Sequence, residues 1–205
     1  SPQSAGTVNI DGDYSLQLGS LCINKGNNSA LSGITTDLAG NIRVHNGQAE
    51  MGAYEFVFCP TVQTVYVDSS KSVSGDGSTW NTAFKTLAEA ITRQSCSNIK
   101  EIRVAKGTYY PTGVQANFNR DSTFLITRGD LKILGGFPSG GGIRNPSNFP
   151  TILSGDIGGT NNIADNSYHV MTISNVISTE DSILIDGFSF INGNANEKKK
   201  KNFNG

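Results

Sequence analysis

The segment from Thr64 to Thr112 constrains the fold of this chain more than any other part. It reads as a short alternating strand at TVYVD, a turn rich in Gly and Asp at SGDGST, one amphipathic helix, and a second strand at EIRVAKGTY. This order begins about sixty residues into the chain. We therefore expect another structural unit to end before it starts.

The helix is expected at about residues 82–94, with Asn81 or Thr79 as its N-cap. Its single apolar face is formed by residues at helical spacing, namely Phe84, Leu87, Ala88 and Ile91. A helix this short is marginal alone and must dock on other elements. The open end of a stack of strands is the acceptor we expect, because apolar interior residues are exposed there.

Short strands separated by Gly, Asn, Pro and Asp follow the helix. They lie in EIRVAKGTY, TFLITRGDLKILGGF, TILSGDI, HVMTISN and ILIDGFSFING. Their starts recur at roughly twenty to thirty residues, which is typical of a solenoid repeat. The inward-facing side chains are expected to be Ile102, Val104, Leu125, Ile133, Ile152, Met171, Ile173, Ile183, Ile185 and Phe188. A β-sandwich, which also has many short strands, is the main alternative.

Several segments carry a family resemblance. VAKGTYYPT, LGGFPSGG, RNPSNFPTILSGDI, NSYHVMTIS and IDGFSFINGNAN resemble successive coils of the pectin-lyase-like right-handed parallel β-helix family of bacterial secreted and surface proteins. DYSLQLGSLCINKG, TTDLAGNIRV and EMGAYEF resemble the C-terminal end of such a unit, although Leu21 stands where the family commonly has Pro. The resemblance implies an all-β fold, a right-handed single-stranded parallel β-helix with one short N-terminal capping α-helix at about 82–94.

Four regions follow from this interpretation. Residues 1–58 are the C-terminal segment of one β-helix unit, and 59–63 are a linker that contains Pro60. Residues 64–197 are the capped N-terminal part of a second unit, and 198–205 are a Lys-rich tail. By the family pattern, more coils should follow, so we expect this chain to be part of a longer one.

Composition excludes some partners. The net charge is −1 and charged residues make up 16% of the chain, so we expect no nucleic-acid binding. The chain has no run of eighteen apolar residues that could span a bilayer, and its first residues do not read as a signal peptide. The resemblance nevertheless implies an extracellular or outer cell-surface location.

The three cysteines make no metal-binding spacing. Cys22 lies in an apolar context and is best read as a small buried hydrophobe. Cys59 and Cys96 lie on either side of the first strand and the helix. They are either a disulfide pair, which would suit an oxidising compartment, or two free thiols.

The acidic residues do not predict catalysis. A lyase or hydrolase for acidic polysaccharide needs clustered carboxylates with an Arg or Lys, and no adjacent-Asp cluster is present. We therefore expect structural roles, and no catalytic residue, among the candidates Asp121, Asp130, Asp156, Asp165, Asp181, Asp186, Arg120, Arg128 and Arg144.

Metal, phosphate and nucleophile signals are weak as well. GDGST and SGDIGGTNN are oxygen-rich, but neither has the pattern of a calcium loop, so we expect no cofactor, with an adventitious Ca2+ as the alternative. LGGFPSGGG lacks the ending of a phosphate loop. His45 and His169 have no nucleophile motif beside them and are expected at turns or strand ends.

Exposed aromatic residues are the better binding candidates, because sugar faces stack on aromatic rings and binding residues concentrate on loops. Tyr110 and Phe118 are the two we expect to contact a glycan, whereas Trp80 is expected to pack under the helix. Asn192, Asn194 and Asn196 are expected to form a structural ladder. The run Lys198–Lys201 is expected to be a solvated end.

Two functions remain open. The first is a non-enzymatic extracellular or cell-surface β-helix module for adhesion, glycan contact or scaffolding, with a polysaccharide or cell-surface glycan as partner. The alternative is a fragment of a polysaccharide lyase or glycoside hydrolase acting on acidic polysaccharide. The superfamily holds both kinds of protein, so its fold alone does not choose between them.

Overall fold

The computed structural model describes part of the chain and divides it into two compact units. The described residues are 14–16, 20–38, 43–44, 48–56, 59–113, 115, 119–159, 162–174, 176 and 182–196. The first unit is Ser1–Phe58 and the second is Cys59–Gly205. Phe118, His45, Asp181 and the lysine run 198–201 lie outside the described residues.

In its described residues, the first unit consists of turns and one 3-10 helix, η1 (Asn28–Ala30). The Asn27 side chain caps η1 by accepting a hydrogen bond from the backbone N–H of Ser29 at 3.0 Å. This unit is held by polar contacts: Gly26 N donates to the carbonyl of Ala49 at 2.7 Å, and Met51 N donates to that of Cys22 at 2.9 Å.

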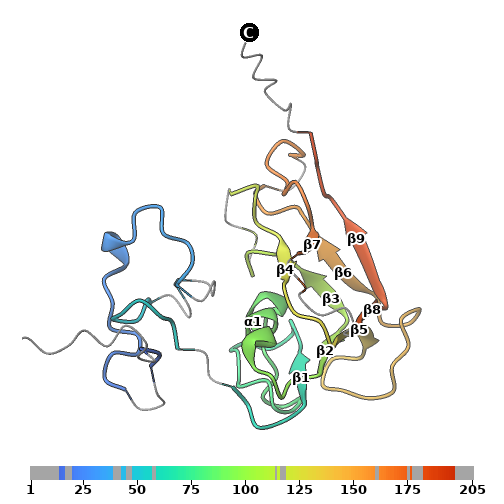
Figure 1. Ribbon diagram of the computed structural model, residues 1–205. Coiled ribbons are helices and arrows are strands. Elements are labelled where there is room, and N and C mark those ends of the chain that lie inside the picture. Colours follow the sequence, from blue (N-terminus) through green and yellow to red (C-terminus); the bar gives the residue numbers. More distant parts are fainter. Residues whose placement is uncertain are drawn as a thin grey trace, which may run out of the picture. The chain divides into compact units, whose positions relative to one another are not determined.

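In its described residues, the second unit contains nine short strands in three separate parallel sheets (Figure 1). The four-stranded sheet has the order β1 (Thr64–Val67), β2 (Glu101–Ala105), β5 (Leu131–Phe137) and β8 (Ile183–Asp186). The three-stranded sheet has the order β3 (Gly107–Tyr109), β6 (Thr151–Ser154) and β9 (Phe188–Ile191). The two-stranded sheet pairs β4 (Phe124–Ile126) with β7 (Met171–Ile173).

The predicted all-β, right-handed parallel β-helix is therefore wrong for this structure. Its described strands form three small sheets with one short helix, a mixed arrangement in which no closed solenoid is seen. The strands are three to seven residues long, and β5 is the longest. Long connections without strands, such as 138–150 and the described parts of 110–123, interrupt the regular succession of strands that a solenoid needs.

The core of the second unit follows the alternation of its strands. Val65, Val67, Ile102 and Ile133 are fully buried, because side chains two residues apart on a strand point to the same face. Val104 is buried as well, so three members of the predicted inward set are in the core.

Two members of that set, Leu125 and Ile173, point outward instead, with exposed fractions of 41% and 51%. Leu125 lies between Phe124 and Ile126, which are both buried, so it has to face solvent. The remaining predicted members are half-buried: Ile152, Met171, Ile183, Ile185 and Phe188.

The helix begins later than the sequence predicts. α1 spans Leu87–Thr92 and continues as the 3-10 helix η2 (Arg93–Ser95). Thr86, and neither Asn81 nor Thr79, is the N-cap: its hydroxyl accepts from Glu89 N at 3.2 Å, and Glu89 Oε2 accepts from Thr86 N at 3.0 Å. α1 contacts β1 and β4 through a buried face that contains Leu87 and Ile91.

Phe84 is not part of the helix, because backbone bonds tie it to the edge of β1. Its N–H donates to the carbonyl of Tyr66 at 2.9 Å, and its own carbonyl accepts from Asp68 N at 2.8 Å. Its ring fills the space beside Gly77, where an added Cβ would stand 2.1 Å from Phe84 Cε2. The outer edge of β1 is thereby covered by the chain's own 77–84 segment.

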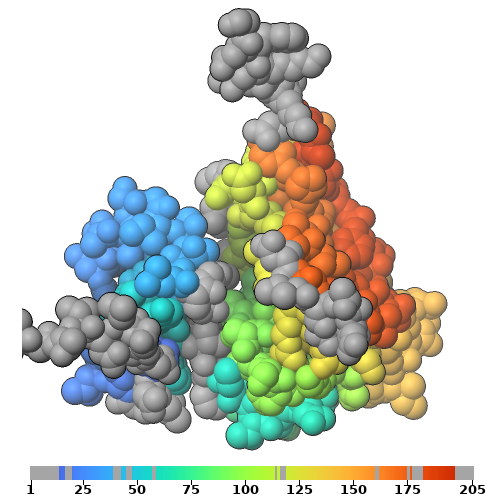
Figure 2. Space-filling model, in the orientation of Figure 1, coloured from blue at the N-terminus to red at the C-terminus, as the bar shows by residue number. Residues whose placement is uncertain are grey.

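Among the described strands, the last strand of each sheet has a strand partner on one side only. β8 and β9, coloured red, lie at the surface of the second unit (Figure 2). Leu184, Phe190 and Ile191 are exposed there, with fractions between 41% and 50%. In the described residues no helix is long and apolar enough to cross a membrane.

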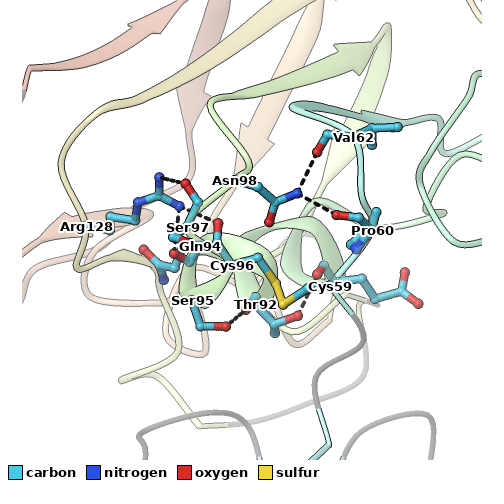
Figure 3. The surroundings of a disulfide bond; sticks show 11 residues. Cys59, Pro60, Val62, Thr92, Gln94, Ser95, Cys96, Ser97, Asn98 and Arg128 are labelled. Atoms are coloured by element: carbon cyan, nitrogen blue, oxygen red, sulfur yellow. Dashed lines mark hydrogen bonds between the residues drawn. A yellow bond between two sulfur atoms is a disulfide. The ribbon is translucent and has the colours of Figure 1, made fainter. Parts of the chain in front are cut away.

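A disulfide fastens the start of the second unit to the end of its helix (Figure 3). Cys59 and Cys96 are bonded, with their Cα atoms 5.5 Å apart, which is the first of the two alternatives given by the sequence. Asn98 Nδ2 donates to the carbonyls of Pro60 at 2.6 Å and Val62 at 3.0 Å. Arg128 Nη1 donates to the Cys96 carbonyl at 2.6 Å. The segment before β1 is therefore fixed by one covalent bond and several polar contacts.

Candidate functional site

The outer face of the four-stranded sheet carries the chemistry-bearing side chains of the second unit. Strand register aligns them in two rows across the sheet, two residues apart along each strand. The first row is Thr64, Glu101, Lys132 and Leu184, and the second is Tyr66, Arg103, Leu134 and Asp186. These residues alternate with the buried core residues, so they share the face that points away from the core.

Three aromatic rings, which we call the aromatic cluster, gather at the second row: Tyr66, Trp80 and Phe137. The ring centroids of Tyr66 and Trp80 are 4.9 Å apart, and those of Trp80 and Phe137 are 5.5 Å apart. Both pairs are tilted, at 52° and 49°, and lie in the favourable distance range for aromatic pairs. Tyr66 and Trp80 are half-buried, whereas Phe137 is buried.

Arg103 joins this cluster to a carboxylate. Its guanidinium carbon lies 5.7 Å from the ring centroid of Phe137 and 6.0 Å from that of Tyr66. Its Nε donates to Glu101 Oε1 at 2.5 Å. The aromatic cluster therefore has a cation and an anion at its border, both held in place by the same strand.

The sequence predicted that Trp80 packs under the helix. In the structure, Trp80 stands against the loop after β5 instead. An added Cβ on Gly141 would lie 2.3 Å from Trp80 Cδ1, so only glycine allows this approach. Gly141 also has φ +94°, a backbone conformation that favours glycine. The 138–142 loop is thus part of the wall that fixes the indole.

Asp68, at the end of β1, holds that loop. Its Oδ2 accepts from Gly140 N at 2.8 Å, and its Oδ1 accepts from Ser70 N at 3.0 Å and Ser70 Oγ at 2.7 Å. Burial would raise the pKa of Asp68, but the hydrogen bonds from Ser70, Gly140 and Ser139 outweigh burial and lower the pKa below its ordinary value. Asp68 is therefore a buried anion that positions the wall of Trp80.

Tyr109, on β3, binds the segment that follows β1 next to Asp68. Its hydroxyl donates to the Ala105 carbonyl at 2.9 Å and accepts from Ser69 N at 3.2 Å. Burial raises the pKa of Tyr109 to about 12, so the phenol stays protonated at neutral pH. Its role is structural.

A shallow hollow of about 270 Å³ opens where the strands of the four-stranded sheet begin. It is lined by Gln63, Thr64, Lys100, Glu101, Asp130, Leu131, Lys132 and Ser182. Lys100 and Asp130 form an ion pair there. The hydrogen bond from Lys100 is the main reason that the pKa of Asp130 lies below its ordinary value. Glu101 links this hollow to the aromatic cluster. It lines the hollow, and it pairs with Arg103, which lies beside the aromatic cluster.

The two predicted glycan-contact residues do not belong to this face. Tyr110 is half-buried and follows β3, which lies in the three-stranded sheet, and Phe118 is outside the described residues. The residues that sequence reasoning missed are Tyr66 and Arg103. Alternation in TVYVD and EIRVA puts both on outer faces, but their proximity depends on the register of β1 and β2, which the sequence does not carry.

Two of the candidate acids, Asp186 and Asp165, are engaged in contacts within the second unit. Asp186 pairs with Arg144, and Asp165 Oδ2 accepts from Gly159 N and Asn162 Nδ2, both at 2.9 Å. Asp121, Asp156, Arg120 and Arg128 lie on other parts of the second unit, apart from the four-stranded sheet.

Two of those arginines hold neighbouring segments together. Arg120 donates to the carbonyls of Asn166 at 2.7 Å and Asn194 at 2.9 Å, and its guanidinium lies 4.1 Å from the ring centroid of Tyr168. Arg128 donates to Ser97 O at 3.0 Å, at the end of the helix. Asn194 Nδ2 donates to the Ile163 carbonyl, so this asparagine connects successive segments as well.

In the part of the chain that the structure describes, no group of three or more His, Cys, Asp or Glu side chains is arranged to hold a metal ion. In the GDGST turn, Asp76 Oδ1 accepts from Ser78 N at 2.9 Å and Ser78 Oγ at 2.7 Å. His169 is exposed. An adventitious calcium ion stays a prediction.

A second polar cluster, which the sequence did not predict, lies in the first unit. Asp37, Glu50 and Glu55 are buried, and Arg43 pairs with Glu55. Burial raises the pKa of Glu50 above its ordinary value, although three backbone hydrogen bonds and Arg43 oppose the shift. Glu55 N donates to Asp37 Oδ2 at 2.8 Å, so this hydrogen bond joins the two ends of the 37–55 segment.

Comparison of the chain with protein-family models, curated proteins and solved structures finds no match.

Proposed function

We propose that this chain is a non-catalytic extracellular or cell-surface module that contacts glycans through the outer face of its four-stranded sheet. The observation that carries the proposal is the aromatic cluster, in which the half-buried Tyr66 and Trp80 pack with the buried Phe137, with Arg103 and Glu101 beside it. Aromatic rings offer an apolar surface to the C–H faces of sugars, and a few fixed polar groups give orientation.

Two rings of the aromatic cluster, Tyr66 on β1 and Phe137 on β5, are on strands, and they flank Trp80, which lies between β1 and α1. Side chains on sheet strands are held more precisely than side chains on loops. Trp80 is held by two aromatic neighbours and by the close approach of Gly141. Little conformational entropy is then lost when a ligand docks.

The extracellular location is supported by the cysteines. A disulfide between Cys59 and Cys96 persists in oxidising compartments and is rare in the cytosol. The resemblance to pectin-lyase-like secreted proteins stays a prediction, since no match to that family is found.

The alternative, a fragment of a polysaccharide lyase or hydrolase, has less support. On the outer face, Asp130 and Asp186 are each engaged by a Lys or Arg, and Glu101 by Arg103. Incubation of the protein with polygalacturonate and calcium tests this alternative. Accumulation of unsaturated product would establish it and overturn the proposal of a non-catalytic module.

Binding is tested by isothermal titration against a panel of neutral and acidic oligosaccharides. We expect Trp80→Ala to weaken binding by about tenfold or more, in line with the loss of an aromatic contact at the centre of an interface. Trp80→Phe keeps an aromatic ring and should lose less.

Tyr110→Ala is the matched control, because it removes a half-buried aromatic ring outside the four-stranded sheet. Circular dichroism and thermal melting verify that each variant is folded. If Tyr110→Ala abolishes binding and Trp80→Ala and Trp80→Phe do not, the binding face is wrong. If no oligosaccharide binds, the proposed function is wrong.

A further inference from the structure

Most of the described positive charges on the outer face of the four-stranded sheet are paired with a carboxylate. Lys100 pairs with Asp130, Arg103 with Glu101, and Arg144 with Asp186. Lys132 lines the hollow together with two carboxylates, Glu101 and Asp130. Of these four described cations, three are thus paired with a carboxylate and the fourth shares the hollow with two carboxylates.

This pairing disfavours an acidic glycan. A uronate or sulfate group would have to compete with Glu101 for Arg103, or with Asp186 for Arg144, and would meet the like charge of the carboxylate that it displaced. Arg144 Nε also donates to the Gly135 carbonyl at 2.7 Å, which fixes the guanidinium further.

A sugar hydroxyl suits the same pairs. A hydroxyl is both donor and acceptor, so it can donate to a carboxylate and accept from the neighbouring cation without breaking their contact. In the hollow, Glu101, Asp130 and Lys132 present both kinds of group side by side. Gln63, Thr64 and Ser182 add neutral donors and acceptors.

The hollow and the aromatic cluster lie along the same strands. Thr64 and Tyr66 are two residues apart on β1, as are Glu101 and Arg103 on β2, which corresponds to about 7 Å along a strand. Glu101 borders both places. A chain of linked sugar rings can thus place one ring in the hollow and another over the aromatic cluster.

We infer that the ligand is a neutral glycan, bound through at least two sugar rings that run along the strands from the hollow to the aromatic cluster. This inference rests on the proposed function, because it assigns the ligand class of the same face. Glu101 and Lys132 then select hydroxyl groups, while Trp80 and Tyr66 supply stacking.

The test compares neutral tetraoses (cellotetraose, xylotetraose and mannotetraose) with tetragalacturonate by isothermal titration. We expect one neutral tetraose to bind at least about tenfold more tightly than tetragalacturonate. Raising NaCl from about 0.1 M to about 1 M, which shortens the Debye length from about 10 to about 3 Å, should change the neutral affinity less than about twofold.

Two conservative variants test the hollow. Glu101→Gln and Lys132→Met should each weaken the binding of the neutral tetraose by about fivefold or more, since each removes a charged hydrogen-bonding group. Asp121→Asn, an exposed carboxylate before β4, is the matched control and should leave affinity unchanged. If Glu101→Gln and Lys132→Met bind like the wild type, the hollow is no part of the site and the inference is overturned.

The two proposals fail in different ways. Tetragalacturonate could bind more tightly than the neutral tetraoses, with an affinity that falls as salt is added and is lost in Trp80→Ala. In that case the neutral-ligand inference is overturned while the glycan-contact function stands. If neither neutral nor acidic tetraoses bind, the proposed function itself is overturned, and the inference with it.

Discussion

At the scale of single residues, Asp68 connects the end of β1 to the loop that touches Trp80. It is fully buried and accepts hydrogen bonds from Ser70 and Gly140. Because its pKa in the folded protein is lowered from 3.8, the charged form stabilises the fold at all pH values above the ordinary pKa. This contribution is lost as the pH falls through the lower folded pKa.

We therefore expect Asp68→Asn to lower the free energy of unfolding by about 1 to 3 kcal/mol at neutral pH, the usual cost of losing charge-assisted hydrogen bonds. The difference from the wild type should shrink as the pH falls from 3.8, where Asp68 of the unfolded chain becomes protonated, through the lower pKa of the folded protein. Urea unfolding at neutral and acid pH measures both values. Asp121→Asn, at an exposed position, is the control, and an equal pH dependence of wild type and Asp68→Asn would contradict the argument.

At the scale of elements, α1 has only six residues and depends on its capping box. Thr86 and Glu89 satisfy each other's backbone N–H groups, which would otherwise lack partners at the helix start. We expect Thr86→Ala to cost about 1 kcal/mol of unfolding free energy, whereas Thr86→Ser, which keeps the hydroxyl, should cost only a few tenths. Urea denaturation of both variants provides the comparison. An equal loss in Thr86→Ala and Thr86→Ser would mean that the methyl group, and not the cap, is responsible.

The same helix marks a limit of prediction from sequence. Phe84 fits the helical spacing of Leu87 and Ile91, and this placed the start of the helix too early. In the structure, Phe84 is fixed by backbone bonds to β1 and by its ring against Gly77. These are tertiary interactions between residues distant in sequence, and local periodicity does not contain them.

Strand positions could be predicted better than strand orientation and assembly. Each predicted strand segment contains at least one strand of the structure, because runs of β-branched and aromatic residues between turn residues are a local signal. In three-residue strands such as β4, alternation is too short to tell which face is buried, and Leu125 was assigned inward although it is exposed. The prediction of a closed solenoid failed for a related reason: it depended on how the strands assemble.

On the outer face of the four-stranded sheet, too, the sequence predicts which residues point outward but not which of them meet. Alternation makes Tyr66 and Arg103 outward-facing, yet their meeting with Trp80 and Phe137 depends on strand register and on the glycine loop at 138–142. Tyr110, which the sequence favoured for glycan contact, follows a strand of another sheet. Residue type was therefore a useful guide to the chemistry, aromatic rings with polar neighbours, but not to the place.

At the scale of the whole molecule, the chain consists of two compact units, and the disulfide belongs entirely to the second. Cys59 and Cys96 are 37 residues apart, so their bond restricts the unfolded chain of that unit. For a loop of this length the expected stabilisation is roughly 3 to 4 kcal/mol. The first unit, Ser1–Phe58, contains the one remaining cysteine, Cys22, which is a free thiol.

We expect calorimetry to resolve two unfolding transitions, since separate compact units commonly unfold as separate cooperative units. Dithiothreitol, or the double variant Cys59→Ser with Cys96→Ser, should lower one transition by on the order of 10 °C and leave the other unchanged. Cys22→Ser is the control and should not reproduce this selective loss. A single transition that shifts as a whole on reduction would mean that the two units unfold together, and the disulfide would then stabilise the entire chain through its second half.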